Sequence, residues 1–135
     1  MSFAADHKFG LTKENEVITL LSNAFGVELV KTSKYASIDF KSDTVDIELK
    51  SRTTARDTYP TTIIPASKIN YIRKYGGSKR FVFAFAFTDG IYYIEYDEAK
   101  FSSFEHKMFV RNKRSDYNDK EQMYCFIPVS ELTKI

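Results

Sequence analysis

Hydrophobic and charged residues alternate along the first six residues of VDIELKSR, residues 45–52, and Ser51 and Arg52 complete the segment. This two-residue period predicts a β-strand whose aliphatic side chains share one face and whose charged side chains share the other. The charged face carries Asp46, Glu48 and Lys50. It is either a solvated face with weak exposed ion pairs, or a place where a carboxylate holds a divalent metal beside an ammonium that positions a water. The surrounding segments have to decide between the two.

A second strand is expected at residues 37–41, and Ser42–Asp43 is the expected two-residue turn between the strands. With this turn, Asp39 lies opposite Asp46 and becomes a diagonal neighbour of Glu48 on the same face. A register slip of one residue would instead turn Asp39 into the apolar layer. The hairpin therefore predicts that two carboxylates converge beside the lysine of the first strand.

An amphipathic helix is expected ahead of the hairpin, capped by Thr12 and stopped by Gly26. The acids of its first turn suit the helix dipole. Glu14 also borders the buried stripe, because it precedes Val17 by three residues. A carboxylate in that position needs a partner, and a metal would supply one. A short strand at residues 27–31 is expected to follow the helix.

The segment after the hairpin is polar and contains prolines, which predicts a loop with a short extended piece at residues 61–64. A helix at residues 67–75 and a second hairpin around Asp89-Gly90 are expected next. The first strand of that hairpin alternates phenylalanine with alanine and valine, which is typical of a central strand covered on both faces. In the C-terminal part, strands are expected at residues 107–111 and 122–129.

The chain has 135 residues, of which 43% are hydrophobic and 16% aromatic, and this predicts a single folded domain over residues 1–135. No apolar run approaches the roughly 20 residues that span a bilayer, and the N-terminus lacks an apolar signal core, so we expect an intracellular, cytoplasmic protein. The single cysteine, Cys125, lies in an apolar run and is expected in the core. The histidines His7 and His106 have no partners at metal-ligand spacing, which argues against a zinc site.

A net charge of +2 does not by itself identify a nucleic-acid binder. The basic residues are clustered, however, and the first cluster includes Tyr71 and Tyr75. Such clusters either neutralise phosphates while the aromatic rings stack on unpaired bases, or form ordinary solvated surface. The basic residues of the two clusters are Lys68, Arg73, Lys74, Lys79 and Arg80, and Lys107, Arg111, Lys113 and Arg114.

The expected order of elements is a helix with Glu14, a strand with Asp39, a strand with Glu48-Leu49-Lys50 and a helix with Lys68. This order resembles the PD-(D/E)XK nuclease superfamily. Residues 10–52 look most like archaeal Holliday-junction resolvases. A similarity to small nuclease-like proteins of phages and large DNA viruses extends to about residue 97. The resemblance implies an α/β (α+β) fold with a restriction-endonuclease-like αβββαβ core, a mixed sheet flanked by helices.

Two features depart from the superfamily pattern. Ile38 stands where the motif's name places proline. The gap between Asp39 and Glu48 is short, which suits a tight hairpin but leaves Asp46 as a rival ligand.

The resemblance implies cleavage of DNA phosphodiester bonds with Mg²⁺ or Mn²⁺ as cofactor. Asp39, Glu48 and the backbone carbonyl of Leu49 would bind the metal, and Glu14 would reach it directly or through a water. Lys50 would orient or help to deprotonate the attacking water and stabilise charge on the phosphate. Glu14, Asp39, Glu48 and Lys50 are thus the implied catalytic residues. The candidate DNA contacts are Arg52, Lys68, Thr61, Thr62 and Arg73.

Three alternatives stay open at this point. A DNA-binding module could keep the fold without the reaction, and a structural protein could have a merely solvated hairpin face, in which case Asp39, Glu48 and Lys50 would be exposed. Among nucleases, a Holliday-junction resolvase acting on branched DNA would need a two-fold homodimer, whereas other structure-specific or restriction-like enzymes would not. The host-cell cytoplasm is the expected location if the protein is viral.

Overall fold

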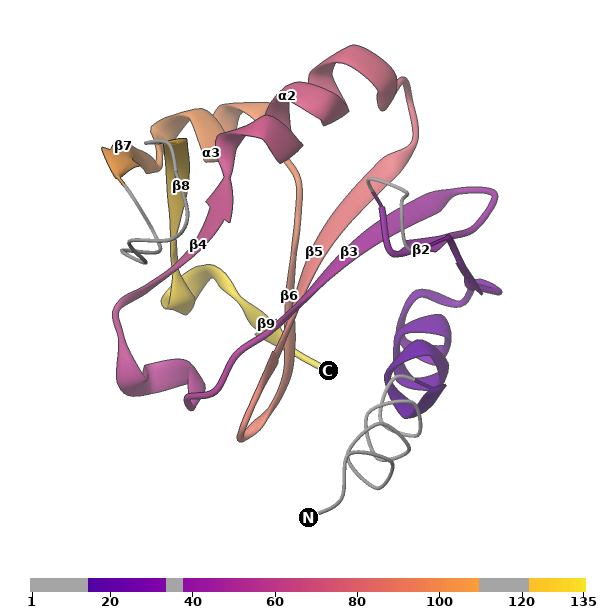
Figure 1. Ribbon diagram of the computed structural model, residues 1–135. Coiled ribbons are helices and arrows are strands. Elements are labelled where there is room, and N and C mark those ends of the chain that lie inside the picture. Colours follow the sequence, from indigo (N-terminus) through magenta and orange to yellow (C-terminus); the bar gives the residue numbers. More distant parts are fainter. Residues whose placement is uncertain (1–14, 34–37, 110–121) are drawn as a thin grey trace, which may run out of the picture.

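A mixed six-stranded sheet forms the centre of the protein, and a separate three-stranded sheet lies beside it (Figure 1). The computed structural model describes residues 15–33, 38–109 and 122–135. The first sheet has the strand order β1-β2-β3-β5-β6-β9, and the second has β4-β8-β7. The strands of the first sheet are β1 (Val30–Lys31), β2 (Phe40–Lys41), β3 (Val45–Ser51), β5 (Arg80–Phe87), β6 (Gly90–Glu95) and β9 (Thr133–Lys134). Those of the second sheet are β4 (Thr61–Pro65), β7 (Glu105–Phe109) and β8 (Gln122–Pro128).

Helices flank the central sheet, as the α+β prediction requires. An N-terminal helix covers residues 15–25, and Gly26 follows it with a positive φ of 63°, the conformation of a helix-terminating glycine. Its expected cap, Thr12, lies outside the described residues. The other helices are α2 (Ala66–Tyr75) and α3 (Glu98–Ser103), with short 3₁₀ turns at Arg56–Thr58 and Val129–Glu131. None of the helices in the described part of the chain is long and apolar enough to cross a membrane.

The core has two layers, one on each face of β3 and β5. On one face, the phenylalanines of β5 pack with Ile69 and Ile72 of α2 and with residues of the second sheet. On the other, Val82 and Ala84 pack with the N-terminal helix and with the aliphatic residues of β3. Strand β5 is therefore buried on both faces, which confirms the prediction of a central strand. Cys125 of β8 is fully buried in the first layer, as expected.

Strands β3 and β5 are parallel, whereas the other strand pairs of the described sheets are antiparallel. A parallel pair needs a crossover connection. Here the chain between β3 and β5 forms β4 and α2, so the crossover carries α2 onto the same face of the sheet as the phenylalanines of β5 (Figure 1). The same crossover brings a lysine of α2 over the charged face of β3.

The turn between β2 and β3 differs from the prediction by one residue. The observed partners are Phe40 with Ile47 and Lys41 with Asp46, whereas the predicted register placed Asp39 opposite Asp46. Ser42 is the cause, because its backbone N–H donates to the Val45 carbonyl at 2.9 Å and its hydroxyl accepts from the Val45 N–H at 2.9 Å. These bonds make Ser42 the first residue of the turn instead of a central one. The expectation of a Ser42–Asp43 turn was therefore wrong.

The shifted ladder keeps the predicted face for every side chain. Each residue of β2 pairs with a residue of β3 two positions later than predicted. A shift of two residues leaves every side chain on the same side of the sheet. Continuing the observed ladder by one step sets Asp39 directly opposite Glu48 instead of diagonal to it. The two carboxylates are thus brought closer than predicted.

Other element boundaries were partly anticipated. The extended piece at residues 61–64 is β4, a full strand that pairs with β8. The strand expected at 107–111 begins earlier, at Glu105, while the strand expected at 122–129 is confirmed as β8. Helix α3 was not predicted.

Candidate active site

Glu48 lies near the middle of β3 and is only 4% exposed. Asp39 precedes β2 and is half-buried, and its Oδ2 accepts a hydrogen bond of 2.7 Å from the backbone N–H of Leu49. This bond ties the Asp39 carboxylate to the strand that carries Glu48. One carboxylate directly ahead of β2 and one in β3 therefore lie on one face of the sheet, beneath the layer that contains α2.

Two lysines approach Glu48 from different elements. Lys50 comes from the same strand, and its Nζ lies 3.5 Å from Glu48 Oε1. Lys68 comes from α2, and its Nζ lies 3.3 Å from Glu48 Oε2. Glu48 is buried and held between ammonium groups, so the interpretation of a solvated hairpin face was wrong.

The pKa of the Glu48 carboxyl is raised above its ordinary value. Burial is the main cause, followed by the negative charge of Asp39, while Lys68 and Lys50 act in the opposite direction without cancelling the rise. Buried Glu48 Oε2 also has no hydrogen bond within the described residues, although it has the ion pair with Lys68. The ionised Glu48 carboxylate therefore has a demand for positive charge beyond what Lys50 and Lys68 supply.

A divalent cation fits this demand chemically. Carboxylate oxygens are the donors that Mg²⁺ prefers, and it is commonly held by one or two carboxylates together with waters and substrate phosphate. Asp39 and Glu48 supply two such groups, and the Leu49 carbonyl belongs to the residue between Glu48 and Lys50. The described residues contain no group of three or more His, Cys, Asp or Glu side chains placed to hold a metal. The third predicted carboxylate, Glu14, lies outside the described residues.

Asp46, the rival ligand, has a lysine of its own. It is 8% exposed, and the Nζ of Lys79 lies 2.7 Å from its Oδ1. Asp46 is two residues from Glu48 towards the start of β3, and its cross-strand partner is Lys41. Buried Asp46 Oδ1, like Glu48 Oε2, has an ion pair with a lysine but no hydrogen bond within the described residues.

Arg52 joins the end of β3 to β4. Its Nε donates to the Thr62 hydroxyl at 3.1 Å, one terminal nitrogen donates to the Ile63 carbonyl at 2.7 Å, and the guanidinium lies 5.5 Å from the Phe85 ring centroid. Thr62 is buried, whereas Thr61 is half-buried. Arg52 and both threonines line a pocket of about 350 Å³, whose other lining residues are Thr53, Thr54, Ala55, Arg56, Tyr59, Ile63 and Phe87. No sequence pattern indicates this pocket, because its walls come from segments that only the fold brings together.

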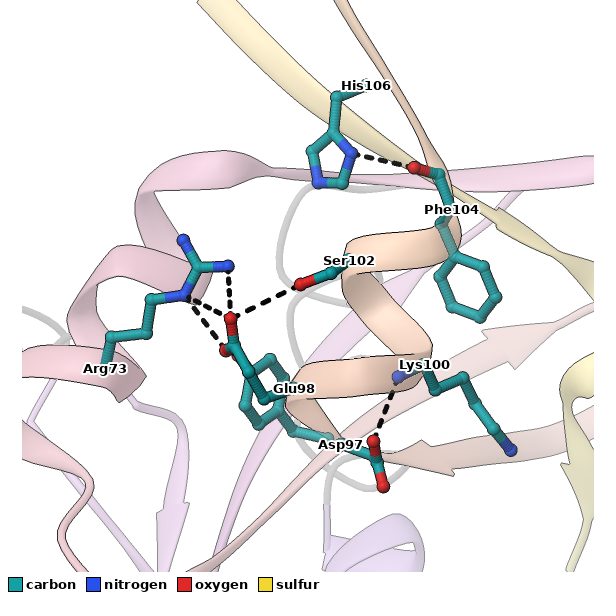
Figure 2. Close-up of polar contacts among 8 residues, drawn as sticks. Arg73, Asp97, Glu98, Lys100, Ser102, Phe104 and His106 are labelled. Atoms are coloured by element: carbon teal, nitrogen blue, oxygen red, sulfur yellow. Dashed lines mark hydrogen bonds and ion pairs between the residues drawn. The ribbon is translucent and has the colours of Figure 1, made fainter.

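Arg73 points away from the Glu48 site. It is five residues after Lys68, which places it about 140° further round α2. Its guanidinium forms an ion pair with Glu98 of α3, with Nη2 2.8 Å from Oε1, and Figure 2 shows this contact beside the bond from Ser102 to the same carboxylate. The structure does not bring Arg73 together with the other predicted DNA contacts.

Replacing Glu48 by glutamine is expected to raise the melting temperature of the metal-free protein by a few degrees near pH 8. The folded state holds the Glu48 proton more tightly than the unfolded chain does, because its pKa is raised. Ionisation of Glu48 therefore does not lower the free energy of unfolding below the ordinary pKa of glutamate. The loss of stability grows as the pH rises through the raised pKa of Glu48. The difference between variant and wild type should vanish in acid. Thermal unfolding in EDTA, followed by circular dichroism across this pH range, measures it.

Glu95→Gln is the matched control for this experiment. Glu95 is exposed and pairs with Arg80 at 2.5 Å, so its neutralisation relieves no burial cost and should not stabilise the protein. A lower melting temperature for Glu48→Gln than for wild type at alkaline pH would mean that the two lysines outweigh burial.

Comparison with known proteins agrees with the geometry. A family model described as "Phage putative PDDEXK endonuclease" matches residues 5–135. Comparisons with curated proteins and with solved structures gave no match. The matched range includes the Asp39 and Glu48-Leu49-Lys50 segments, and it extends through the C-terminal part, for which the residues alone suggested no relative. The predicted membership of the nuclease superfamily and the phage association are both confirmed. The chain belongs to this phage family of the PD-(D/E)XK nuclease superfamily.

Proposed function

We propose that this protein is a metal-dependent endonuclease that hydrolyses phosphodiester bonds in DNA, with Mg²⁺ or Mn²⁺ as cofactor. The observation that carries the proposal is the buried Glu48 carboxylate, set beside Asp39 and within 3.5 Å of the ammonium groups of both Lys50 and Lys68. Opposite charges arranged in this way can hold a cation and an anionic phosphate at the same time.

Each residue has a role that follows from its position. Asp39, Glu48 and the Leu49 carbonyl would hold the cation, and Glu14 is proposed as a further ligand. A bound divalent cation would lower the pKa of its water and neutralise phosphate charge. Lys50 orients the attacking water and donates hydrogen bonds to a phosphate oxygen.

The predicted DNA-contacting residues lie in different parts of the structure, and their proposed roles differ accordingly. Lys68 faces Lys50 across Glu48, so it is proposed to contact the scissile or adjacent phosphate. Arg52 and Thr61 line the neighbouring pocket and are proposed to contact the next phosphate. Buried Thr62 acts through Arg52 by accepting its N–H, and Arg73, held by Glu98, is left out of the DNA contacts.

The proposed substrate is branched DNA or DNA with another non-duplex structure. Four-way junctions are among these proposed substrates. A resolvase of such junctions would act as a two-fold homodimer that sets two sites across the branch. The phage association of the family makes the host cell the proposed place of action.

Cleavage of four-way junction, flap, duplex and single-stranded DNA in Mg²⁺, Mn²⁺ and EDTA tests the proposal. We expect cleavage in either metal and none in EDTA, because the carboxylate pair alone provides no activated water. Size-exclusion chromatography with light scattering tests the dimer. Equal cleavage in EDTA and in Mg²⁺ would overturn the metal-dependent assignment.

A further inference from the structure

One flank of α2 carries Lys68, Tyr71 and Tyr75. Their spacing of three and four residues aligns them along one side of a helix, next to the buried face formed by Ile69 and Ile72. This aligned set, Lys68, Tyr71 and Tyr75, is called the tyrosine stripe below. Over seven residues it extends about 10 Å along the helix axis.

The two rings of the stripe differ in burial but touch each other. Their centroids are 5.0 Å apart with the ring planes inclined at 45°. Tyr71 is half-buried and packs against the core, whereas Tyr75 is 63% exposed. The inner ring is thus fixed by the core and supports the outer one, so an exposed aromatic surface is held in place at little cost in side-chain entropy.

Positive charge accompanies the rings at both ends of the stripe. Lys74 places its Nζ 5.3 Å from the Tyr75 ring centroid, and Lys68 ends the stripe at the Glu48 carboxylate. The stripe is therefore continuous with the candidate active site and complementary to a polyanion. Aromatic rings interspersed with lysines are the usual surface for single-stranded nucleic acid, because every base has a face that can stack.

We propose that the tyrosine stripe is a stacking platform for unpaired nucleotides next to the scissile phosphate. The inference rests on the proposed nuclease function and narrows its substrate to DNA with a single-stranded segment at the cleavage site. In an intact duplex, both faces of each internal base are already stacked on neighbouring bases. No internal base is therefore available to stack on the exposed Tyr75 ring. A flap, an overhang or the opened centre of a junction supplies such a base.

Binding measurements on Tyr75→Ala test the platform. Fluorescence anisotropy is recorded in EDTA with labelled oligothymidylate and with a labelled blunt-ended duplex that has no unpaired nucleotides. Because base stacking on an aromatic side chain contributes about 1–3 kcal/mol, we expect binding of oligothymidylate to weaken about 5- to 150-fold. Binding of the duplex should stay nearly unchanged.

Two variants of α2 serve as controls. Tyr75→Phe keeps the ring and should keep the affinity for oligothymidylate. Asn70→Ala alters an exposed residue on another side of the helix and should leave both affinities unchanged. Unchanged oligothymidylate binding in Tyr75→Ala, or equal losses on both DNA forms, would overturn the proposal.

Cleavage assays separate this inference from the proposed function. If wild type shows the Tyr75-dependent preference but never cleaves DNA with metal, the catalytic proposal fails and the platform stands. If Tyr75→Ala cleaves flap and duplex in the same ratio as wild type, the platform fails and the nuclease assignment stands.

Discussion

The Lys50→Ala substitution is expected to lower the single-turnover rate of DNA cleavage by about 10²–10⁴-fold. Lys50 Nζ lies 3.5 Å from Glu48, so it can contact a water or phosphate oxygen held at that carboxylate. Its loss removes both the orientation of the nucleophile and a positive charge that matches the transition state. Binding of DNA should weaken far less, because the stripe and Lys68 remain. Rapid-mixing cleavage assays with saturating Mg²⁺, together with anisotropy in EDTA, measure the two effects.

Lys79→Gln is the matched control for Lys50→Ala. Lys79 also pairs with a buried carboxylate of β3, because its Nζ lies 2.7 Å from Asp46. Its replacement should lower stability, which thermal unfolding reports, but leave cleavage by the folded protein close to wild type. Comparable losses of cleavage in both variants would show that the lysines act only by stabilising the sheet.

Local sequence patterns anticipated the parts of the fold that depend on local physics. The alternation along β3 placed its aliphatic residues in the core, and the phenylalanine alternation of β5 predicted a strand buried on both faces. Both patterns reflect the two-residue period of a strand. The unpredicted helix α3 also has a local signal, since the Asp97 side chain accepts from the Lys100 N–H at 2.9 Å as an N-terminal cap. With only six residues, that helix has too little periodicity to be seen without the cap.

Features that depend on contacts between segments far apart in the chain could not be predicted from local sequence patterns. Part of the cover over the charged face of β3 comes from α2, whose Lys68 lies 3.3 Å from Glu48, and no residue within the strand encodes that cover. Arg73 illustrates the same limit, since its partner Glu98 is 25 residues further along the chain. The turn at Ser42 was decided by a single hydroxyl that bonds the backbone of Val45.

The second large effect distinguishes Asp39 from Asp46 as the carboxylate that binds the metal together with Glu48. Asp39→Asn is expected to abolish detectable cleavage and the rise in melting temperature that Mg²⁺ or Mn²⁺ gives to wild type. The reason is that a neutral amide removes a carboxylate from the site and lowers the negative charge available to a cation. Asp46→Asn should retain cleavage and metal-induced stabilisation, because Asp46 lies opposite Lys41 and pairs with Lys79, whereas Asp39 lies opposite Glu48. Isothermal titration with Mn²⁺ and thermal unfolding measure both variants.

The comparison also tests the observed register of the β2–β3 hairpin. In that register Asp39 lies opposite Glu48, and its carboxylate accepts from the Leu49 N–H. The register predicted from a Ser42–Asp43 turn would set Asp39 opposite Asp46 and make Asp46 the nearer carboxylate. If Asp46→Asn lost metal binding while Asp39→Asn kept it, the site would have to be built around Asp46 and Glu48 on one strand. Loss in Asp39→Asn alone would mean that the cation is held by Asp39, which precedes β2, together with Glu48 of β3, as the observed pairing places them.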